Sequence, residues 1–518
     1  MMFSEKDKLQ IKSHGLTTDA IEAQVTSIKS GMVYSNLKEA ATIGNGILKI
    51  GNTQASYYIK LFEAKRDAIS MVKFVPASGA ATRMFKFLFQ FLNDYRLNHE
   101  SIEDYAKRTG NKDIIEFFNE LEKLPFYELV IKKILEKISN YDEISYDERC
   151  VEFVKTMLDE EQLNYSFYPK GLLPFHKYKT HVATAFEEHF FEAAFYASSN
   201  KLANLHLTIS NVHQENFQKE LNHIIKDVEC KTEHKFNISF SNQKSVTDTI
   251  ALTSDNEIYR EQDGSILFRP SGHGALLENL NDLDYGFIFI KNIDNLVVND
   301  QLEEVCNYKK ILAAILLEVQ EQVFKFLKLL DNGNLDDNDI HAVTKFITKT
   351  LNIVIAPDFE FSSLESKIFY LKDKLNRPIR VCGMVKNEGE PGGGPFWVTD
   401  SDGAVSLQII EFAQIDISKS DQKSIIESAT HFNPTDLVCG VKNYRGEPFN
   451  LMDYVDHKAA FITDKTQAGT HIKALELPGL WNGSMAYWNS IFVEVPLNTF
   501  NPVKTVNDLL RSSHQVKQ

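Results

Sequence analysis

Small residues follow an apolar run in the segment KFVPASGAATRMFK, residues 73–86, and a helix-like stretch begins after Arg83. Two interpretations are open. The segment is an ordinary strand-to-helix turn, or it is a phosphate cradle in which small side chains let backbone N–H groups approach an anion. The small residues are Ala77, Ser78, Gly79 and Ala80. Taken alone, the segment slightly favours the ordinary turn.

A second glycine-containing segment, RPSGHGALLENL, follows a predicted strand, where open α/β sheets place ligands. His273 lies between Gly272 and Gly274, just before a predicted helix. A capping or packing role is the plain interpretation. The two glycines would, however, leave the histidine ring and the adjacent backbone accessible to a ligand.

Two more segments place polar side chains next to apolar runs. FIFIKNIDNLV ends in Asn292, Asp294 and Asn295. An Asx turn and a Mg²⁺ site are both open here, since a carboxylate at the end of a buried strand can hold a cation that prefers oxygen ligands. Lys504, in PLNTFNPVKTVNDLL, is by default a solvated lysine whose role depends on its neighbours.

Strands and helices alternate along most of the chain, which is typical of a layered α/β fold with a largely parallel sheet. Residues 1–70 are predicted to be helical, and residues 71–510 to form one α/β domain. Helical insertions are expected at about 87–166 and 303–350. Residues 511–518 are predicted to be a tail.

The composition is that of a globular protein and excludes some functions. Hydrophobic residues make up 43% of the 518 residues and charged residues 25%, with a formal net charge of -15. This charge disfavours a general binder of nucleic acid or of anionic membranes. No apolar run is long enough to span a bilayer, and the N-terminus lacks a signal-peptide core. Five cysteines without a CxxC pair suit a reducing cytoplasm.

In their order along the chain, these segments resemble those of the eukaryote-type UDP-sugar pyrophosphorylases, from about Met71 to Leu510. PASGAATRM stands where that family has a GGxGTRL-like loop, YPKGLLPF matches its YPKG segment, and RPSGHGALLENL its PxGHGD segment. FSNQ stands at its uracil-binding position, and LQIIEFAQI is similar to its LxEYxxI strand. NIDNL and PVKT…DLL are the most specific matches. The chain also resembles an uncharacterised family of unknown function from Bacteroidetes-type bacteria.

The pyrophosphorylase resemblance implies a Rossmann-like nucleotidyltransferase fold of the glycosyltransferase-A type, with a largely parallel mixed sheet. It implies an enzyme that joins a sugar 1-phosphate to a nucleoside triphosphate, expected to be UTP, with Mg²⁺ as cofactor and pyrophosphate as product. The implied catalytic residues are Arg83 and Lys170 on the triphosphate, Asp294 on Mg²⁺ and Lys504 on the phosphates being joined. The implied nucleotide-binding residues are Ala77, Ser78, Gly79, Ala80, Gln243, Gly272, His273 and Gly274. The implied sugar-binding residues are Asn295, Glu411 and Asn482.

The chain departs from this pattern in three places. The glycine-rich loop has the sequence SGAA, residues 78–81, in place of GGxG, which crowds the approach to a nucleotide. Ala275 replaces the acidic residue of GHGD. A helical insertion separates Arg83 from Lys170, which are nearly contiguous in the family.

Two other classes of function stay open. One is a nucleotide-sugar sensor without catalytic activity on the same fold, which the altered loop and the missing acid favour. The other is an interaction protein that works through its helical insertion. The sugar, the nucleotide and the oligomeric state are not specified by the sequence.

Overall fold

The computed structural model describes residues 3–333, 335–389, 392–400 and 403–517, which form two compact units. Unit 1 consists of Met1–Phe74, Ser241–Ile290 and Tyr308–Leu497. Unit 2 consists of Val75–Phe240, Lys291–Asn307 and Asn498–Gln518. Each unit is therefore assembled from segments that lie far apart in the sequence.

Unit 1 is built on a mixed sheet in which most neighbouring pairs are parallel. The strands, in spatial order, are β2 (Thr42–Ile43), β3 (Gly46–Leu48), β20 (Asn489–Glu494), β13 (Ile379–Lys386), β17 (Asp436–Gly440), β12 (Phe287–Lys291) and β4 (Met71–Pro76). The pairs β2–β3, β3–β20, β20–β13 and β12–β4 are parallel, and β13–β17 is antiparallel. The apolar runs MVKFV and FIFIK form buried strands, as expected of a parallel sheet covered on both faces. The predicted α/β class with a largely parallel sheet is confirmed.

The first 70 residues contain strands as well as the predicted helices. The helices are α1 (Glu5–Ser13), α2 (Thr18–Ser30) and α3 (Asn52–Lys65). Between α2 and α3 lie β1 (Asn36–Ala40), β2 and β3. Strand β1 pairs with β14 (Gly393–Thr399), and β3 pairs with β20. These strands take their partners from distant parts of the chain, so local helix propensity does not decide their structure.

Two smaller sheets and several helices complete unit 1. One sheet has the order β1–β14–β15, and β15 (Val405–Glu411) ends at Glu411. The other has the order β11 (Phe268–Arg269), β10 (Thr249–Thr253), β19 (Thr470–Glu476) and β18 (Phe461–Gln467). The helices are α11 (Leu277–Asn281), α13 (Asp337–Lys349), α14 (Leu364–Leu375), α15 (Ser420–Glu427) and most of α12 (Asn299–Asn332).

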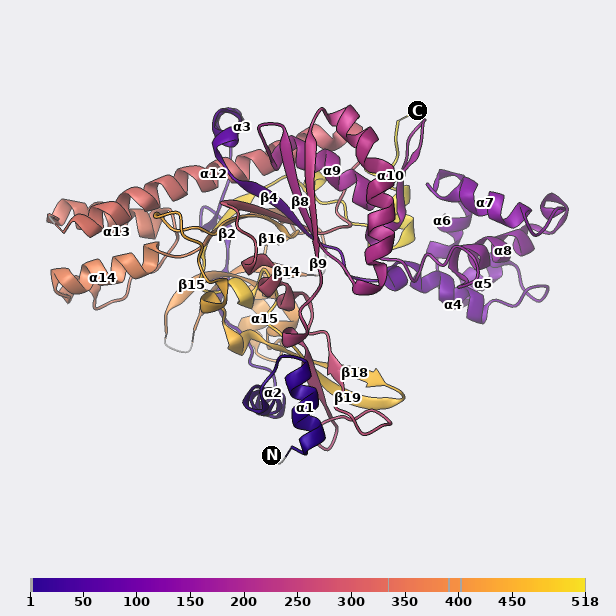
Figure 1. The fold of residues 1–518 in the computed structure, drawn as a ribbon, viewed down its shortest axis with the longest axis horizontal. Helices are drawn as coiled ribbons and strands as arrows, with labels where there is room; N and C mark the ends of the chain where they lie inside the picture. The colour runs from indigo at the N-terminus through magenta and orange to yellow at the C-terminus, as the bar shows by residue number, and fades with distance from the viewer. Residues whose placement is uncertain (1–2, 334, 390–391, 401–402, 518) are drawn as a thin grey trace. The chain divides into compact units, whose positions relative to one another are not determined.

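Unit 2 combines short strands, two packed helices and a helical bundle. The strands are β5 (Pro174–Lys177), β6 (Val182–Thr184), β7 (Ser198–Ser199), β8 (Leu202–Thr208) and β9 (Lys235–Ser241). Helix α9 (Ala185–Tyr196) packs against β8 and against α10 (Gln214–Thr232). The bundle is formed by α4 (Lys86–Asp94), α5 (Ile102–Thr109), α6 (Asp113–Asn119), α7 (Tyr127–Leu135) and α8 (Tyr146–Leu158), which lie together in Figure 1.

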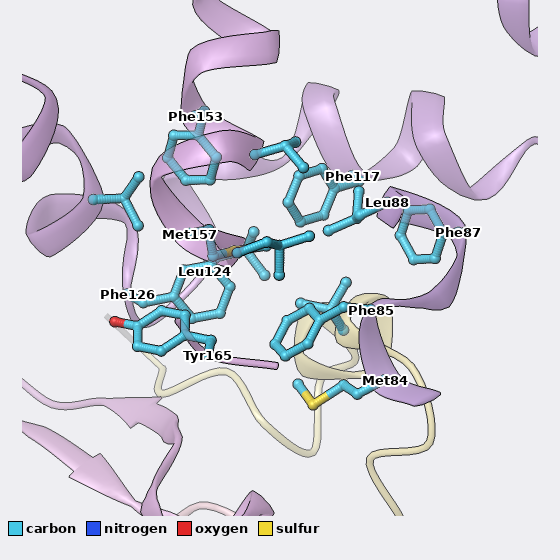
Figure 2. Close-up of a cluster of buried hydrophobic side chains, with 14 of the residues drawn as sticks. Met84, Phe85, Phe87, Leu88, Phe117, Leu124, Phe126, Phe153, Met157 and Tyr165 are labelled. Carbon is cyan, nitrogen blue, oxygen red and sulfur yellow. The ribbon is translucent and has the colours of Figure 1, made fainter. Parts of the chain in front are cut away.

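The bundle is held by a phenylalanine-rich apolar cluster. Figure 2 shows labelled side chains of this cluster, among them Phe117 and Phe153, whose ring centroids lie 6.2 Å apart. The same cluster includes Leu296, Val503, Val506 and Leu509 from outside the bundle. Leu296 lies two residues after Asp294, and Val503 lies directly before Lys504. The bundle core therefore includes side chains from the segments that carry these two predicted site residues.

Two observations bear on the predicted organisation of the chain. None of the helices that the structure describes is long and apolar enough to cross a membrane. The segment predicted as a C-terminal tail contains Ser513 and His514, which are both buried.

Replacing Phe153 by alanine is expected to lower the free energy of unfolding by about 3–5 kcal/mol, because it leaves a cavity in a fully buried cluster. Urea-induced unfolding of the full chain measures this change. The control is Phe361→Ala, which removes a ring that is 92% exposed and should change stability by less than about 0.5 kcal/mol. Equal effects of the two substitutions would contradict the cluster's role.

Candidate active site

The predicted phosphate loop lies beside the YPKG segment, although the helical insertion separates the two in sequence. Ala80 forms an isolated β-bridge with Pro169, and the amide of Ala81 donates a hydrogen bond of 3.0 Å to the carbonyl of Tyr168. The polypeptide therefore enters and leaves the bundle at neighbouring points within unit 2. Lys170 follows Pro169 directly, so the structure brings the loop and this lysine into one region.

The loop exposes its small residues and its arginine. Ser78, Gly79 and Ala80 are exposed, whereas Ala77 is buried. A Cβ atom on Gly79 would meet nothing within 4 Å, so no packing contact requires glycine there. The next turn is a short 3₁₀ helix, Ala81–Phe85, and α4 begins only at Lys86. Arg83 is exposed and makes no ion pair with any described residue.

Lys170 and Asp294 form an ion pair that also reaches the Lys504 segment. Lys170 Nζ lies 2.6 Å from Asp294 Oδ2 and donates a second bond of 2.7 Å to the carbonyl of Val503. The amide of Val503 in turn donates to the carbonyl of Asp294 at 3.0 Å. The side chains of Lys170 and Asp294 are 17% and 18% exposed. Three of the predicted catalytic segments therefore meet at one point.

Helix α9 fixes the strand end that presents Asp294. Lys291 donates to Glu192 Oε1 at 2.5 Å, and both side chains are fully buried. The ring of His189, also on α9, lies 3.0 Å from the carbonyl of Ile293 through its Nε2 atom, which must donate. These contacts hold the residues on both sides of Asn292. Contacts with helix α9 thus fix the backbone just before Asp294.

Asn295 and Lys504 are placed by contacts within unit 2. Asn295 is 1% exposed; its Oδ1 accepts from the amide of Asn501 at 2.8 Å, and its Nδ2 donates to the carbonyl of Thr499 at 3.4 Å. Its side chain therefore holds the loop that carries Lys504. Lys504 Nζ lies 5.6 Å from the centroid of the Phe500 ring, a cation–π distance.

The predicted sugar-binding residues Glu411 and Asn482 contact each other in unit 1. Asn482 Nδ2 donates to Glu411 Oε1 at 2.9 Å, and His273 Nε2 lies 3.8 Å from the same oxygen. His273 also stacks on Trp481 with a centroid distance of 4.2 Å and accepts the amide of Leu480 through Nδ1. The ring of His273 therefore holds the loop that presents Asn482.

Glu411 is suited to accept hydrogen bonds at neutral pH. Burial by itself raises the pKa of Glu411, but the neighbouring His273 and the hydrogen bond from Asn482 outweigh burial and hold the pKa below its usual value. The carboxylate is therefore ionised and can accept a bond from a hydroxyl group.

The two glycines around His273 have structural requirements of their own. Gly272 has a φ of +82°, in the left-handed region. A Cβ atom on Gly274 would lie 2.1 Å from the carbonyl oxygen of Pro478. Gln243 lies on the same unit and donates to Asp248 Oδ1 at 3.5 Å, a long contact that a ligand could replace.

A cavity of about 460 Å³ lies beside Asn482 in unit 1. Its wall combines apolar and hydrogen-bonding side chains, and the latter include Asp400, Gln408, Gln414, Asp456, Lys458 and Asn482. Asn482 is 1% exposed, and its Oδ1 has no hydrogen-bond partner among the described residues. Tyr34 and Tyr487 also line the cavity and offer aromatic faces. Such a wall suits a ligand with several hydroxyl groups.

A metal ion would have few protein ligands here. Within the described part of the chain, no group of three or more His, Cys, Asp or Glu side chains could hold a metal ion. Lys170 donates a hydrogen bond to Oδ2 of Asp294, and no described residue donates one to Oδ1. Mg²⁺ is commonly held by one or two carboxylates together with substrate phosphates. Asp294 therefore offers one carboxylate oxygen to a cation whose other ligands come from outside the protein.

The sequence interpretation missed the residues that position the site. Glu188, His189 and Glu192 of α9, Trp481 and the carbonyl of Val503 were not singled out. A signal was present for α9: charged residues four positions apart interrupt the apolar helix AFEEHFFEAAFY, which indicates buried charge that needs partners.

Comparisons with known proteins give one family and several distant structures. A family model described as "Domain of unknown function (DUF4301)" matches residues 4–515. No curated protein matches the sequence. The expectation of a family of unknown function is thus confirmed.

Solved structures that match the chain have low identity and low TM-scores. A UDP-glucose phosphorylase from Trypanosoma brucei is 13% identical, with 97% of this chain and 77% of that chain covered and a TM-score of 0.44. A uridine diphosphate N-acetylglucosamine pyrophosphorylase from Trypanosoma brucei is 10% identical, with coverages of 98% and 82% and a TM-score of 0.46. A UDP-glucose pyrophosphorylase from Leishmania major is 13% identical, with coverages of 98% and 79% and a TM-score of 0.44.

The contact between Lys170 and Asp294 is expected to give a favourable coupling of about 1–3 kcal/mol in a double-mutant cycle, because both groups are largely buried. Urea unfolding of wild type, Lys170→Met, Asp294→Asn and the double variant measures it. The exposed pair Lys201–Glu233, treated in the same way, should show no coupling beyond error. Additive effects at Lys170 and Asp294 would show that the ion pair does not form.

Proposed function

We propose that this chain, which belongs to the DUF4301 family, is a nucleotidyltransferase that joins a sugar 1-phosphate to a nucleoside triphosphate, with UTP as the nucleotide. The observation that carries the proposal is the Lys170–Asp294 pair, held against the segment of Lys504 beside the exposed loop of residues 77–83. This arrangement offers cationic groups and one carboxylate in the same region. The order of the motifs along the sequence also resembles that of UDP-sugar pyrophosphorylases.

The chemistry needs charge neutralisation more than acid–base catalysis. An oxygen of the sugar phosphate attacks the α-phosphorus of the triphosphate, and the bond from that phosphorus to the bridging oxygen breaks. Pyrophosphate leaves with the electron pair, and no proton must be removed because the attacking phosphate is already an anion. Positioning and electrostatic stabilisation supply most of the rate in such a transfer.

The cationic residues of unit 2 divide this task. Arg83, exposed and without an ion pair among the described residues, would bind the β- and γ-phosphates that leave. Lys170 would donate its third N–H to a phosphate oxygen while it stays bonded to Asp294 and to the carbonyl of Val503. Lys504 would stabilise the phosphates being joined. A Mg²⁺ ion held through Asp294 would neutralise charge on the triphosphate when bound.

The resemblance to UDP-sugar pyrophosphorylases assigns recognition of the base and the sugar to Gln243, Glu411 and Asn482. Gln243 would hydrogen-bond the base, since its hydrogen bond to Asp248 is long, at 3.5 Å, and easily exchanged. Glu411 and Asn482 would bind hydroxyl groups of the sugar: the Glu411 carboxylate is ionised, and Asn482 lines the cavity of about 460 Å³. We place the reaction in the cytoplasm, where free thiols such as the five cysteines persist.

Asp294→Asn is expected to reduce pyrophosphate release to near background, because it removes the charge that would hold the cation while keeping the shape. Lys504→Ala should lower the rate by about 10²–10³, as for the loss of one donor aimed at developing charge. Pyrophosphate release from UTP and Mg²⁺ with a panel of sugar 1-phosphates measures both. Lys201→Ala, which changes an exposed lysine of the same unit, is the control.

Three outcomes of this assay are decisive. If the panel shows turnover and both variants release pyrophosphate at the wild-type rate, the catalytic roles assigned to Asp294 and Lys504 are wrong. No turnover by the unmodified protein, together with nucleotide binding, would favour the sensor. If the unmodified protein neither releases pyrophosphate nor binds a nucleotide, the results would favour an interaction protein that works through its helical insertion.

UTP is expected to raise the thermal stability of the full chain more than ATP does, since only a base contact distinguishes the two ligands. Gln243→Ala should shrink that difference by about 0.5–1.5 kcal/mol, the usual net value of one hydrogen bond. A thermal-shift series with four nucleotides and Mg²⁺ measures it. Equal shifts for all four would leave phosphate binding without base recognition.

A further inference from the structure

A chain of buried hydrogen bonds leads from helix α9 to the loop that carries Lys504. Glu188 Oε1 accepts from the hydroxyl of Tyr178 at 2.7 Å and contacts His176 Nδ1 at 2.7 Å. His176 Nε2 lies 3.0 Å from His514 Nδ1, and His514 Nε2 lies 3.2 Å from the carbonyl oxygen of Asn501. Glu188, His176 and His514 are at most 2% exposed.

The directions of the two hydrogen bonds that His514 makes follow from the carbonyl acceptor at one end. A carbonyl oxygen can only accept, so His514 Nε2 donates to Asn501. A neutral His514 then accepts at Nδ1, and His176 Nε2 must donate to it. Burial, and next the charge of nearby His176, lower the pKa of His514 to about 3, which agrees with a neutral ring. Nδ1 of His176 then faces Glu188 Oε1 at 2.7 Å, close enough for the two atoms to share one proton.

The chain of hydrogen bonds ends at the Asn501 peptide, whose carbonyl and amide groups are both hydrogen-bonded to side chains. The carbonyl of Asn501 accepts from His514, and its amide donates to Asn295 at 2.8 Å. Two residues later, the carbonyl of Val503 accepts from Lys170, and Lys504 follows. The position of the Asn501 peptide therefore sets where the next three residues lie.

His514 also lines a cavity of about 590 Å³ at the surface of unit 2. Tyr178, Lys179 and Gln515 lie in the same wall. A small molecule can therefore reach the place of the His514 ring if that side chain is shortened.

We propose that His514 is a positioning residue for Lys504: the buried Glu188–His176 pair anchors its ring, and the ring fixes the Asn501 carbonyl and so the loop. His514 touches no substrate. This inference rests on the proposed function for its consequence in catalysis. The anchoring of the loop stands on the geometry alone.

Three substitutions separate the hydrogen bond of His514 from its volume. His514→Phe fills the space without a donor. His514→Gln keeps an N–H group near the position of Nε2. His514→Ala opens the site to free imidazole through the cavity. His223→Ala, at an exposed histidine of α10, is the matched control.

The first measurement is amide hydrogen exchange in the full chain, which needs no enzymatic activity. Exchange at Asn501 and Val503 should rise about tenfold in His514→Phe and in His514→Ala, and stay near wild type in His514→Gln. Added imidazole should lower it again in His514→Ala and have no effect in His223→Ala. Unchanged exchange in His514→Phe, or no response of His514→Ala to imidazole, would overturn the proposal.

The second measurement is pyrophosphate release. His514→Phe should lower kcat about 10–100-fold with KM for UTP changed less than threefold, and imidazole should restore kcat in His514→Ala. A larger change in KM than in kcat would overturn the positioning role. If wild type releases no pyrophosphate while the exchange results hold, the proposed function fails and the anchoring of the loop stands.

Discussion

Helix α9 buries several ionisable side chains, and the need to give three of them a partner fixes the candidate catalytic segments. Glu188, His189 and Glu192 are at most 1% exposed. An unpaired buried charge costs several kcal/mol, so conformations that separate these groups from their partners are strongly disfavoured. Glu192 and His189 hold the strand end before Asp294, and Glu188 acts through two histidines on the loop before Lys504. One rigid helix therefore positions both segments.

The helical insertion adds an apolar layer to these polar anchors. Its core takes in Leu296, Val503 and Val506, which are neighbours of Asp294 and Lys504 in sequence. Polar contacts specify where the segments lie, because hydrogen bonds are directional, and the apolar cluster supplies stability, because burial of phenylalanine is strongly favourable. The buried face of the insertion is thus committed to supporting the site. A partner protein would have to use its outer surface.

The sequence predicted the α/β class because buried runs such as MVKFV and FIFIK have few alternatives to strands in a covered sheet. Motif order also brought Asp294 and Lys504 into one hypothesis, and the structure places their segments in contact. Other features depend on contacts with no local pattern. Strands β1–β3 pair with distant strands. The side chain of Asn295 is hydrogen-bonded to backbone groups. His514 is buried, although it lies in a polar stretch, SSHQVKQ, that predicts a tail. A single histidine carries no periodicity, so its long-range partners could not be foreseen.

The pairing of Lys170 with Asp294 constrains how a nucleotide would bind. Lys170 Nζ donates to Asp294 and to the carbonyl of Val503, so one of its three N–H groups remains for a phosphate oxygen. Asp294, largely buried, would then share its compensating cation with a highly anionic ligand. A nucleotide alone would therefore gain one contact and create one repulsion. A divalent cation that arrives with the nucleotide would offset this repulsion, because it would neutralise charge on both the phosphates and Asp294. On the proposed function, the ion pair thus couples cation and nucleotide binding: each ligand removes the electrostatic penalty that the other would meet alone.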